Sequence, residues 1–117
     1  MPPTLADRLR HVLSAINDIN HILEGKTRDE FAADRIIRAA TERLLEIISE
    51  ASRRIPEDIK AREAQIPWQR VADLGNILRH AYHDTNPDII WRIAKHELAP
   101  LQAFVEKIIR DVDSSSS

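Results

Sequence analysis

Hydrophobic residues recur every three or four positions over residues 5–23, a spacing that predicts a helix with one buried face. Thr4 precedes this run and Asp7 follows three residues later, so the two residues can cap the first turn of the helix. The helix is predicted to end at Gly25. Its inward positions are Leu5, Leu9, Val12, Leu13, Ile16, Ile19 and Leu23.

A second helical run follows at once. Thr27 and Glu30 have the spacing of a capping box, in which the hydroxyl and the carboxylate each bond a backbone N–H. One continuous helix is predicted from there to near Ser52, before Ile55 and Pro56, because proline disfavours helix in the residue before it. The predicted inward positions are Phe31, Ile36, Ile37, Ala40, Leu44, Ile47 and Ile48. The link between the two helices is so short that they must be antiparallel neighbours.

A mostly polar connector occupies residues 53–66, and one short helix is predicted in it, over residues 56–64. Pro67 suits the first turn of a third helix, where its missing N–H would be unpaired anyway, and this helix is predicted to run through residues 75–83.

A fourth helix is predicted after Asn86, which can act as its cap, with Pro87 in its first turn. Pro100 interrupts the hydrophobic pattern and is expected to bend this helix. The chain is expected to fray from Asp111, with residues 113–117 forming a disordered tail. The inward positions are Ile89, Ile90, Ile93, Leu98, Leu101, Val105, Ile108 and Ile109.

These elements predict an all-α fold, an antiparallel four-helix bundle with one extra short helix between its second and third helices. At 117 residues the chain has the size of one domain, so residues 1–117 are expected to form a single domain.

Composition supports the helical prediction and limits the chemistry. Only two glycines and 4% aromatic residues argue against a turn-rich β architecture, and the lack of cysteine excludes disulfides and thiolate metal sites. The net charge of -2 means that any contact with RNA must come from local positive charge. Neither a secretory signal nor an apolar run long enough to span a membrane is present in this sequence, so we expect a cytoplasmic protein without a membrane partner.

The third predicted helix gathers an unusual set of polar side chains. At helical spacing Asn76, Arg79, His80 and His83 form one polar stripe, which Asp73 and Gln69 extend backward. On the opposite, core-facing side lie Val71, Leu74, Leu78 and Ala81, with Tyr82 at the margin.

Three interpretations of this stripe are open. A histidine beside an arginine can perform acid–base chemistry on a phosphodiester, because imidazole takes and gives protons near neutral pH and a guanidinium neutralises phosphate oxygens. Cleavage of RNA by its own 2′-hydroxyl needs those two groups and no metal. Alternatively, the residues are solvated or interfacial polar groups without chemistry. A metal site of His80 and His83 with Asp84 or Asp73 is the third interpretation, but neither Glu-x-x-His nor His-x-x-x-His accompanies them, so we predict no metal. His11 and His21 are expected at the surface, and His96, beside the expected bend, in a structural role.

Several blocks of this sequence resemble the HepT-like family. They are Ser52-Arg53-Arg54-Ile55-Pro56, Ile66-Pro67-Trp68, Val71-Ala72, residues 76–82, Ile90-Trp91 and residues 96–101. The resemblance extends from the first helix to about Val112. HepT-like proteins are small ribonuclease toxins of the HEPN fold, encoded beside a minimal nucleotidyltransferase antitoxin. The resemblance therefore implies a HEPN-like bundle and an RNA substrate.

The resemblance also implies a site. Members of the family that this sequence resembles carry an Arg-x4-His-x-Tyr motif on their third helix. In these proteins two chains pair so that both motifs line one cleft. Its histidine, asparagine and tyrosine match His80, Asn76 and Tyr82, whereas the position of its arginine is Gly75. Arg79 is the expected substitute. Glycine within a helix also indicates close packing or a backbone approach.

We therefore expect a metal-independent endoribonuclease toxin acting as a homodimer with a composite site. His80, Arg79 and Asn76 would be catalytic, His83 and Asp73 would bind substrate, and Tyr82 would accept adenylate from the nucleotidyltransferase antitoxin. No cofactor is expected. The alternative is a catalytically weak or inactive HEPN scaffold that binds a nucleotidyltransferase or RNA, which the glycine at position 75 and the mildly acidic charge favour.

Overall fold

The computed structural model describes residues 4–81 and 86–115, apart from the side chains of residues 79–81 and 114–115. In chain order the elements are α1 (Leu5–Leu23), α2 (Arg28–Ala33), α3 (Arg35–Arg53), α4 (Glu57–Lys60), the 3-10 helix η1 (Ala61–Glu63), α5 (Trp68–Ala72), α6 (Leu74–Ala81), α7 (Pro87–Arg92), the π-helical segment η2 (Ile93–Glu97) and α8 (Ala99–Ser115). Every element in this part of the chain is helical, which confirms the predicted all-α fold.

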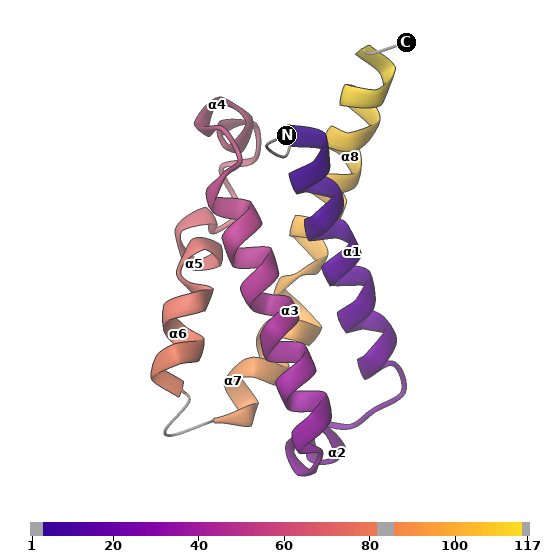
Figure 1. Cartoon of the computed structure of the whole chain (residues 1–117), viewed down its shortest axis with the longest axis vertical. Coiled ribbons are helices and arrows are strands. Elements are labelled where there is room, and N and C mark those ends of the chain that lie inside the picture. The colour runs from indigo at the N-terminus through magenta and orange to yellow at the C-terminus, as the bar shows by residue number, and fades with distance from the viewer. Residues whose placement is uncertain (1–3, 82–85, 116–117) are drawn as a thin grey trace.

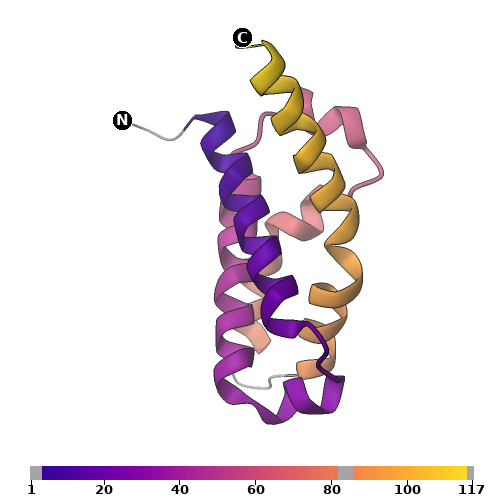
Figure 2. The same ribbon diagram turned by 90° about the vertical axis from the view of Figure 1, so that its right-hand side faces the viewer.

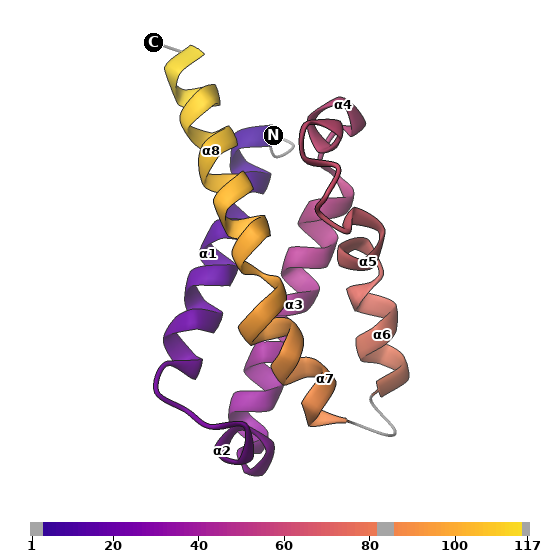
Figure 3. The same ribbon diagram turned by 180° about the vertical axis from the view of Figure 1, so that it is seen from behind.

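The helices run up and down the long axis of the molecule (Figure 1). α1 leads away from the end where the N-terminus lies, α3 returns, α5 and α6 lead away again, and α7 to α8 return. Seen from the side, α1 lies between α3 and α8, and it contacts both (Figure 2). From behind, α6 lies next to α3 (Figure 3). This arrangement is the predicted antiparallel bundle, and α4 with η1 is the predicted short helix in the connector.

The start of α1 follows the sequence closely. Thr4 Oγ1 accepts a hydrogen bond from the backbone N–H of Asp7 at 3.1 Å, and the backbone N–H of Thr4 donates to the Asp7 carboxylate at 3.0 Å. The hydrogen bond from the Thr4 backbone N–H to the carboxylate is the main cause that holds the pKa of Asp7 below its usual value. The helix ends at Leu23, and Gly25 follows in the left-handed region with φ of +73°.

The prediction of one continuous second helix is wrong. The capping box of Thr27 and Glu30 forms as predicted, but the chain breaks again at Asp34, whose backbone is extended. The Asp34 carboxylate accepts hydrogen bonds from the backbone N–H groups of Ile36 and Ile37, both at 3.1 Å, and so caps a new helix. Residues 28–53 therefore form two helices, α2 and α3.

This break changes which face of α3 is buried. An extended residue interrupts the regular rotation per residue, so positions after Asp34 no longer share the face of Phe31. Ile36, predicted inward, is 77% exposed, and Ala40 is also exposed. Of the other predicted positions, Phe31 and Ile48 are buried, and Ile37, Leu44 and Ile47 are half-buried. The buried face of α3 instead carries Thr41, Leu45, Ile48, Ser49, Ala51 and Ser52.

Two tryptophans pack within the chain. The indole N–H of Trp68 is 3.1 Å from the carbonyl oxygens of both Lys60 and Glu63, and its ring meets Phe104 edge-on at 5.3 Å. Trp91 lies 5.5 Å from Phe31, measured between ring centroids. Each ring therefore ties a short helix to a distant part of the core.

The last helical run contains the predicted irregularity. η2 and Leu98 separate α7 from α8, immediately before Pro100, as expected when proline removes a helical hydrogen bond. In η2 the Lys95 ammonium donates to the carbonyl oxygen of Leu23 at 3.1 Å and lies 5.1 Å from the Trp91 ring centroid, so the irregular segment is tied to the end of α1.

The C-terminal helix differs from the expected fraying at Asp111. α8 continues to Ser115, and Arg10 donates to the Asp113 carboxylate at 2.7 Å, which links this end to α1. Residues 116–117 lie outside the described residues.

The buried apolar side chains form a cluster to which α1, α2, α3, α4, α6, α7, η2 and α8 contribute. Within the described residues, no helix is both long and apolar enough to cross a membrane.

Candidate functional site

The predicted site lies on α5 and α6, which together replace the single predicted third helix. Asp73 joins the two helices, because its N–H donates to Gln69 O at the end of α5 and its carbonyl oxygen accepts from Ile77 N–H at the start of α6, both at 3.0 Å. The Ala72 carbonyl also accepts hydrogen bonds from Ser49 Oγ at 2.8 Å and Arg53 Nε at 2.9 Å. Side chains that bond into a helical ladder in this way bend the helix, which explains the break at Asp73.

Gly75 is held close to α3. Its backbone N–H donates to Ser49 Oγ at 3.4 Å, and the residue is buried. The glycine was predicted to mark close packing or a backbone approach, and the burial of Gly75 beside α3 agrees with this prediction. Ser49 therefore bonds both sides of the α5–α6 junction and fixes the start of α6 against the scaffold.

The core-facing side of α6 is confirmed for the residues whose side chains are described. Leu74 and Leu78 are buried, and Val71 on α5 is half-buried. These contacts orient α6, so that its other side faces away from the hydrophobic core.

The polar stripe is described in its first half. Gln69 and Asn76 are exposed and Asp73 is half-buried, with the Gln69 amide donating to both Asp73 carboxylate oxygens at 3.2 Å. Arg79 and His80 belong to α6, and His80 lies one turn beyond Asn76 along that helix. The side chains of Arg79, His80 and Ala81 lie outside the description, as do Tyr82, His83 and Asp84 entirely.

A groove of about 350 Å³ runs between α3 and the first turn of α6. Gly75 lines it from the α6 side, and the α3 side is lined by Arg43, Glu46, Ser49, Glu50 and Arg53. The charged side chains among these described lining residues, two arginines and two glutamates, have no net formal charge together. The groove lies directly beside the helix that carries the predicted catalytic positions.

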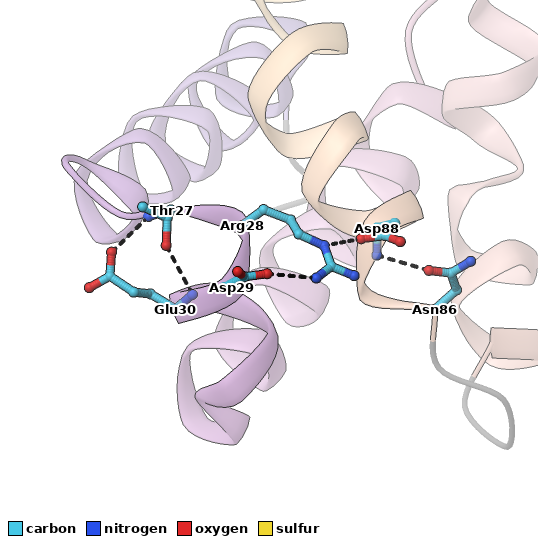
Figure 4. Close-up of polar contacts among 6 residues, drawn as sticks. All are labelled: Thr27, Arg28, Asp29, Glu30, Asn86 and Asp88. Atoms are coloured by element: carbon cyan, nitrogen blue, oxygen red, sulfur yellow. Dashed lines mark hydrogen bonds and ion pairs between the residues drawn. The ribbon is translucent and has the colours of Figure 1, made fainter.

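A cluster of polar contacts forms a clamp at the start of α7 (Figure 4). Asn86 caps α7 by accepting a hydrogen bond from the Asp88 N–H at 3.0 Å. Arg28 on α2 reaches Asp88 through its Nε and Asp29 through its Nη1, the latter at 2.8 Å. The hydrogen bond from Arg28 lowers the pKa of Asp88, and the same pair raises the pKa of Arg28. This clamp fixes the start of α7 relative to α2.

Comparison with known proteins decides the family. The model of the family Ribonuclease HepT-like matches residues 12–108, which is most of the chain. The chain belongs to the HepT-like ribonuclease family.

Individual relatives agree with this HepT-like assignment. "Probable ribonuclease HepT" from Thermococcus cleftensis is 32% identical over 102 residues, 87% of this chain and 93% of that protein. "Putative RNase MJ0125" from Methanocaldococcus jannaschii is 32% identical over 105 residues, 90% of each chain. "Putative RNase TTE0752" from Caldanaerobacter subterraneus subsp. tengcongensis is 28% identical, over 87% of this chain and 91% of that protein. No solved structure matches.

The sequence alone did not point to the polar residues of α3 in this HepT-like chain. Ser49 lies within the second predicted helix. The sequence feature that could have indicated its role is a small polar residue directly after the inward-facing Ile48. In the sequence, Arg53 stands out only as part of the block Ser52-Arg53-Arg54-Ile55-Pro56. Its hydrogen bond to Ala72 crosses 19 residues and depends on how α3 packs against α5.

The remaining residues that could bind a metal ion do not cluster among the described side chains. Among the residues whose side chains are described, no three histidine, aspartate or glutamate residues come close enough together to hold a metal ion. The alternative set of His80, His83 and Asp84 falls outside that description. His11 and His21 are exposed, as predicted, and His96 is exposed on η2, where a structural role had been expected.

Proposed function

We propose that this HepT-like chain is a metal-independent endoribonuclease whose catalytic surface is the polar side of α6. The observation that best supports this proposal is the way α6 packs against the rest of the fold. Leu74, Leu78 and the Ser49–Gly75 contact hold one side of the helix against the core, while Asn76 on the polar stripe is exposed. A catalytic helix fixed in this way can hold its reactive groups in one geometry.

The chemistry follows from the residue types. The 2′-oxygen of the RNA attacks the adjacent phosphorus, the bond from phosphorus to the 5′-oxygen breaks, and a 2′,3′-cyclic phosphate and a 5′-hydroxyl form. His80 takes the proton from the 2′-hydroxyl or gives one to the leaving 5′-oxygen. Arg79 neutralises the phosphate oxygens, and Asn76 hydrogen-bonds the substrate or positions the histidine.

Two chains would complete the site. In the proposed homodimer, the polar sides of both α6 helices line one cleft, so that each protomer supplies a histidine and one can act as base while the other acts as acid. His83 and Asp73 would contact the RNA at the edges of this cleft.

The proposed biological role is that of a toxin paired with a minimal nucleotidyltransferase antitoxin. Tyr82 would accept an adenylate group from this partner. A bulky anionic group beside the cleft would exclude RNA by steric hindrance and by repulsion between like charges.

A second candidate function is supported by Gly75. The arginine expected from the family resemblance is absent at this position, and the overall charge of -2 does not attract RNA. The chain would then be a catalytically weak or inactive HEPN scaffold that binds a nucleotidyltransferase or RNA.

One assay separates these functions. The purified chain is incubated with RNA in EDTA, beside the same RNA carrying 2′-deoxyribose at the cleaved positions. The endoribonuclease predicts cleavage that resists EDTA and stops at the deoxy positions. Prior incubation with ATP and a minimal nucleotidyltransferase should abolish cleavage by wild type but spare Tyr82→Phe. RNA left intact by a folded chain would favour the scaffold.

A further inference from the structure

The groove between α3 and the first turn of α6 has a wall made of backbone. Ser49 Oγ donates to the Ala72 carbonyl oxygen at 2.8 Å and accepts from Gly75 N–H at 3.4 Å, so the two helices lie in direct contact there. Because Gly75 carries no side chain, nothing projects from α6 into the groove at this position. Among the side chains that the structure describes, the charged groups that could meet a ligand here come from α3.

Arg53 is the best-positioned of these groups. Its Nε donates to the Ala72 carbonyl oxygen at 2.9 Å, which fixes the plane of the guanidinium at the side of the groove. Its Nη1 lies 4.0 Å from the nearest Glu50 carboxylate oxygen, beyond hydrogen-bond distance. Within the described residues its two Nη groups therefore keep their N–H donors available, in the fork that a phosphate accepts.

Arg43 provides a second cation further along the groove. Its side chain is 71% exposed, and its hydrogen bond to Glu46 is long, at 3.4 Å. Exposed ion pairs of this kind contribute little to stability, so a phosphate can displace the carboxylate. Glu46 and Glu50 offset the positive charge in the groove and should weaken anion binding.

We propose that this groove binds a backbone phosphate of single-stranded RNA, with Arg53 as the fixed ligand and Arg43 as the second. The proposal rests on the endoribonuclease function, because the groove adjoins α6, the helix on which His80 also lies. A guanidinium from α3 would supply beside Gly75 the positive charge that α6 itself lacks at that position.

The test is the binding of a fluorescently labelled single-stranded RNA, methylated at every 2′-oxygen to prevent cleavage, to the whole chain over a series of salt concentrations. Arg53→Met should weaken binding about tenfold, the effect of one charge-assisted hydrogen bond. It should also reduce the slope of log K against log salt by about 0.7, the value for one lost phosphate contact on a single strand. Glu46→Gln should strengthen binding about twofold or more, because it removes an opposing charge.

Arg54→Met is the matched control. Arg54 is the next residue, its side chain is 57% exposed and bonded to Glu50 at 3.1 Å, and it does not line the groove. It should change the salt slope little. Since Arg53 also bonds Ala72, circular dichroism must show that each variant is folded, and the gain expected for Glu46→Gln cannot result from unfolding.

Two results would overturn the proposal. If Arg53→Met and Arg54→Met weaken binding equally, or Glu46→Gln has no effect, the groove is not the phosphate site. If Arg53→Met changes the oligomeric state in gel filtration but leaves RNA binding unchanged, the groove contacts protein instead. Absence of RNA binding by the wild-type chain would instead contradict the proposed function itself.

Discussion

Ser49 and Ser52 lie on the same buried side of α3, but their hydroxyl groups have different surroundings. Ser49 Oγ bonds Ala72 and Gly75, whereas Ser52 Oγ is buried with no hydrogen-bond partner among the described residues. A buried polar atom without a partner costs free energy, and removing one that has partners leaves those partners unpaired.

The two alanine substitutions should therefore differ in stability. Ser49→Ala should lower the free energy of unfolding by about 1–3 kcal/mol, because the Gly75 N–H and one bond to the Ala72 carbonyl are lost. Ser52→Ala should change it by less than about 0.5 kcal/mol or raise it. Urea unfolding of both variants beside wild type measures this difference, and equal losses would show that Ser49 does not hold the junction as described.

Residue-level features were predictable where their cause is local. The capping boxes at Thr4 and Thr27 are visible as spacings of three residues, and a glycine inside a helical pattern indicated the approach that Gly75 makes. Arg53 could not be placed in the same way, because its hydrogen bond to Ala72 exists only once α3 and α5 have packed.

At the scale of the elements, breaks within predicted helices are the main departure from the sequence pattern. Asp34 lies in a run of good helix formers, so its role as a cap was hidden, although aspartate is a preferred N-cap. The break at Asp73 has a tertiary cause, the two α3 side chains that bond the Ala72 carbonyl. Pro100, by contrast, disrupts a helix by its own chemistry, and its effect was predictable.

The clamp between α2 and α7 gives a pH-dependent prediction. The hydrogen bond from Arg28 lowers the pKa of Asp88 below the unfolded value of about 3.9, so the pair stabilises the fold fully above that pH. This contribution is lost as the pH falls through the lower folded pKa. Asp88→Asn should therefore be less stable than wild type at pH near 7. This difference in stability should become smaller as the solution is made more acidic.

The measurement is the thermal unfolding midpoint of wild type and Asp88→Asn across this pH range. Asp29→Asn is the control, since Asp29 also accepts from Arg28 but lies on the same helix and joins no second element. A difference for Asp88→Asn that stays constant with pH would contradict the role assigned to its ionised carboxylate.

At the scale of the whole molecule, the order and direction of the helices followed from the sequence, because four amphipathic runs with short links have few ways to pack. The exposed side of α3 could not be predicted from the sequence. The break at Asp34 changed which positions of the helix face the core, and Ile36 is exposed as a result. The proposed catalytic role of α6 rests on residue types and on family resemblance, and the fold adds the way that α6 is anchored to α3.

The central claim is that RNA cleavage depends on the histidine of α6. The most direct measurement is single-turnover cleavage of one RNA by wild type, His80→Ala and His96→Ala, all in EDTA. His96 is the control, because it is exposed on a different element. Loss of general acid–base catalysis predicts a rate at least about 100-fold lower for His80→Ala and an unchanged rate for His96→Ala. Cleavage by a folded His80→Ala chain at the wild-type rate would contradict the account.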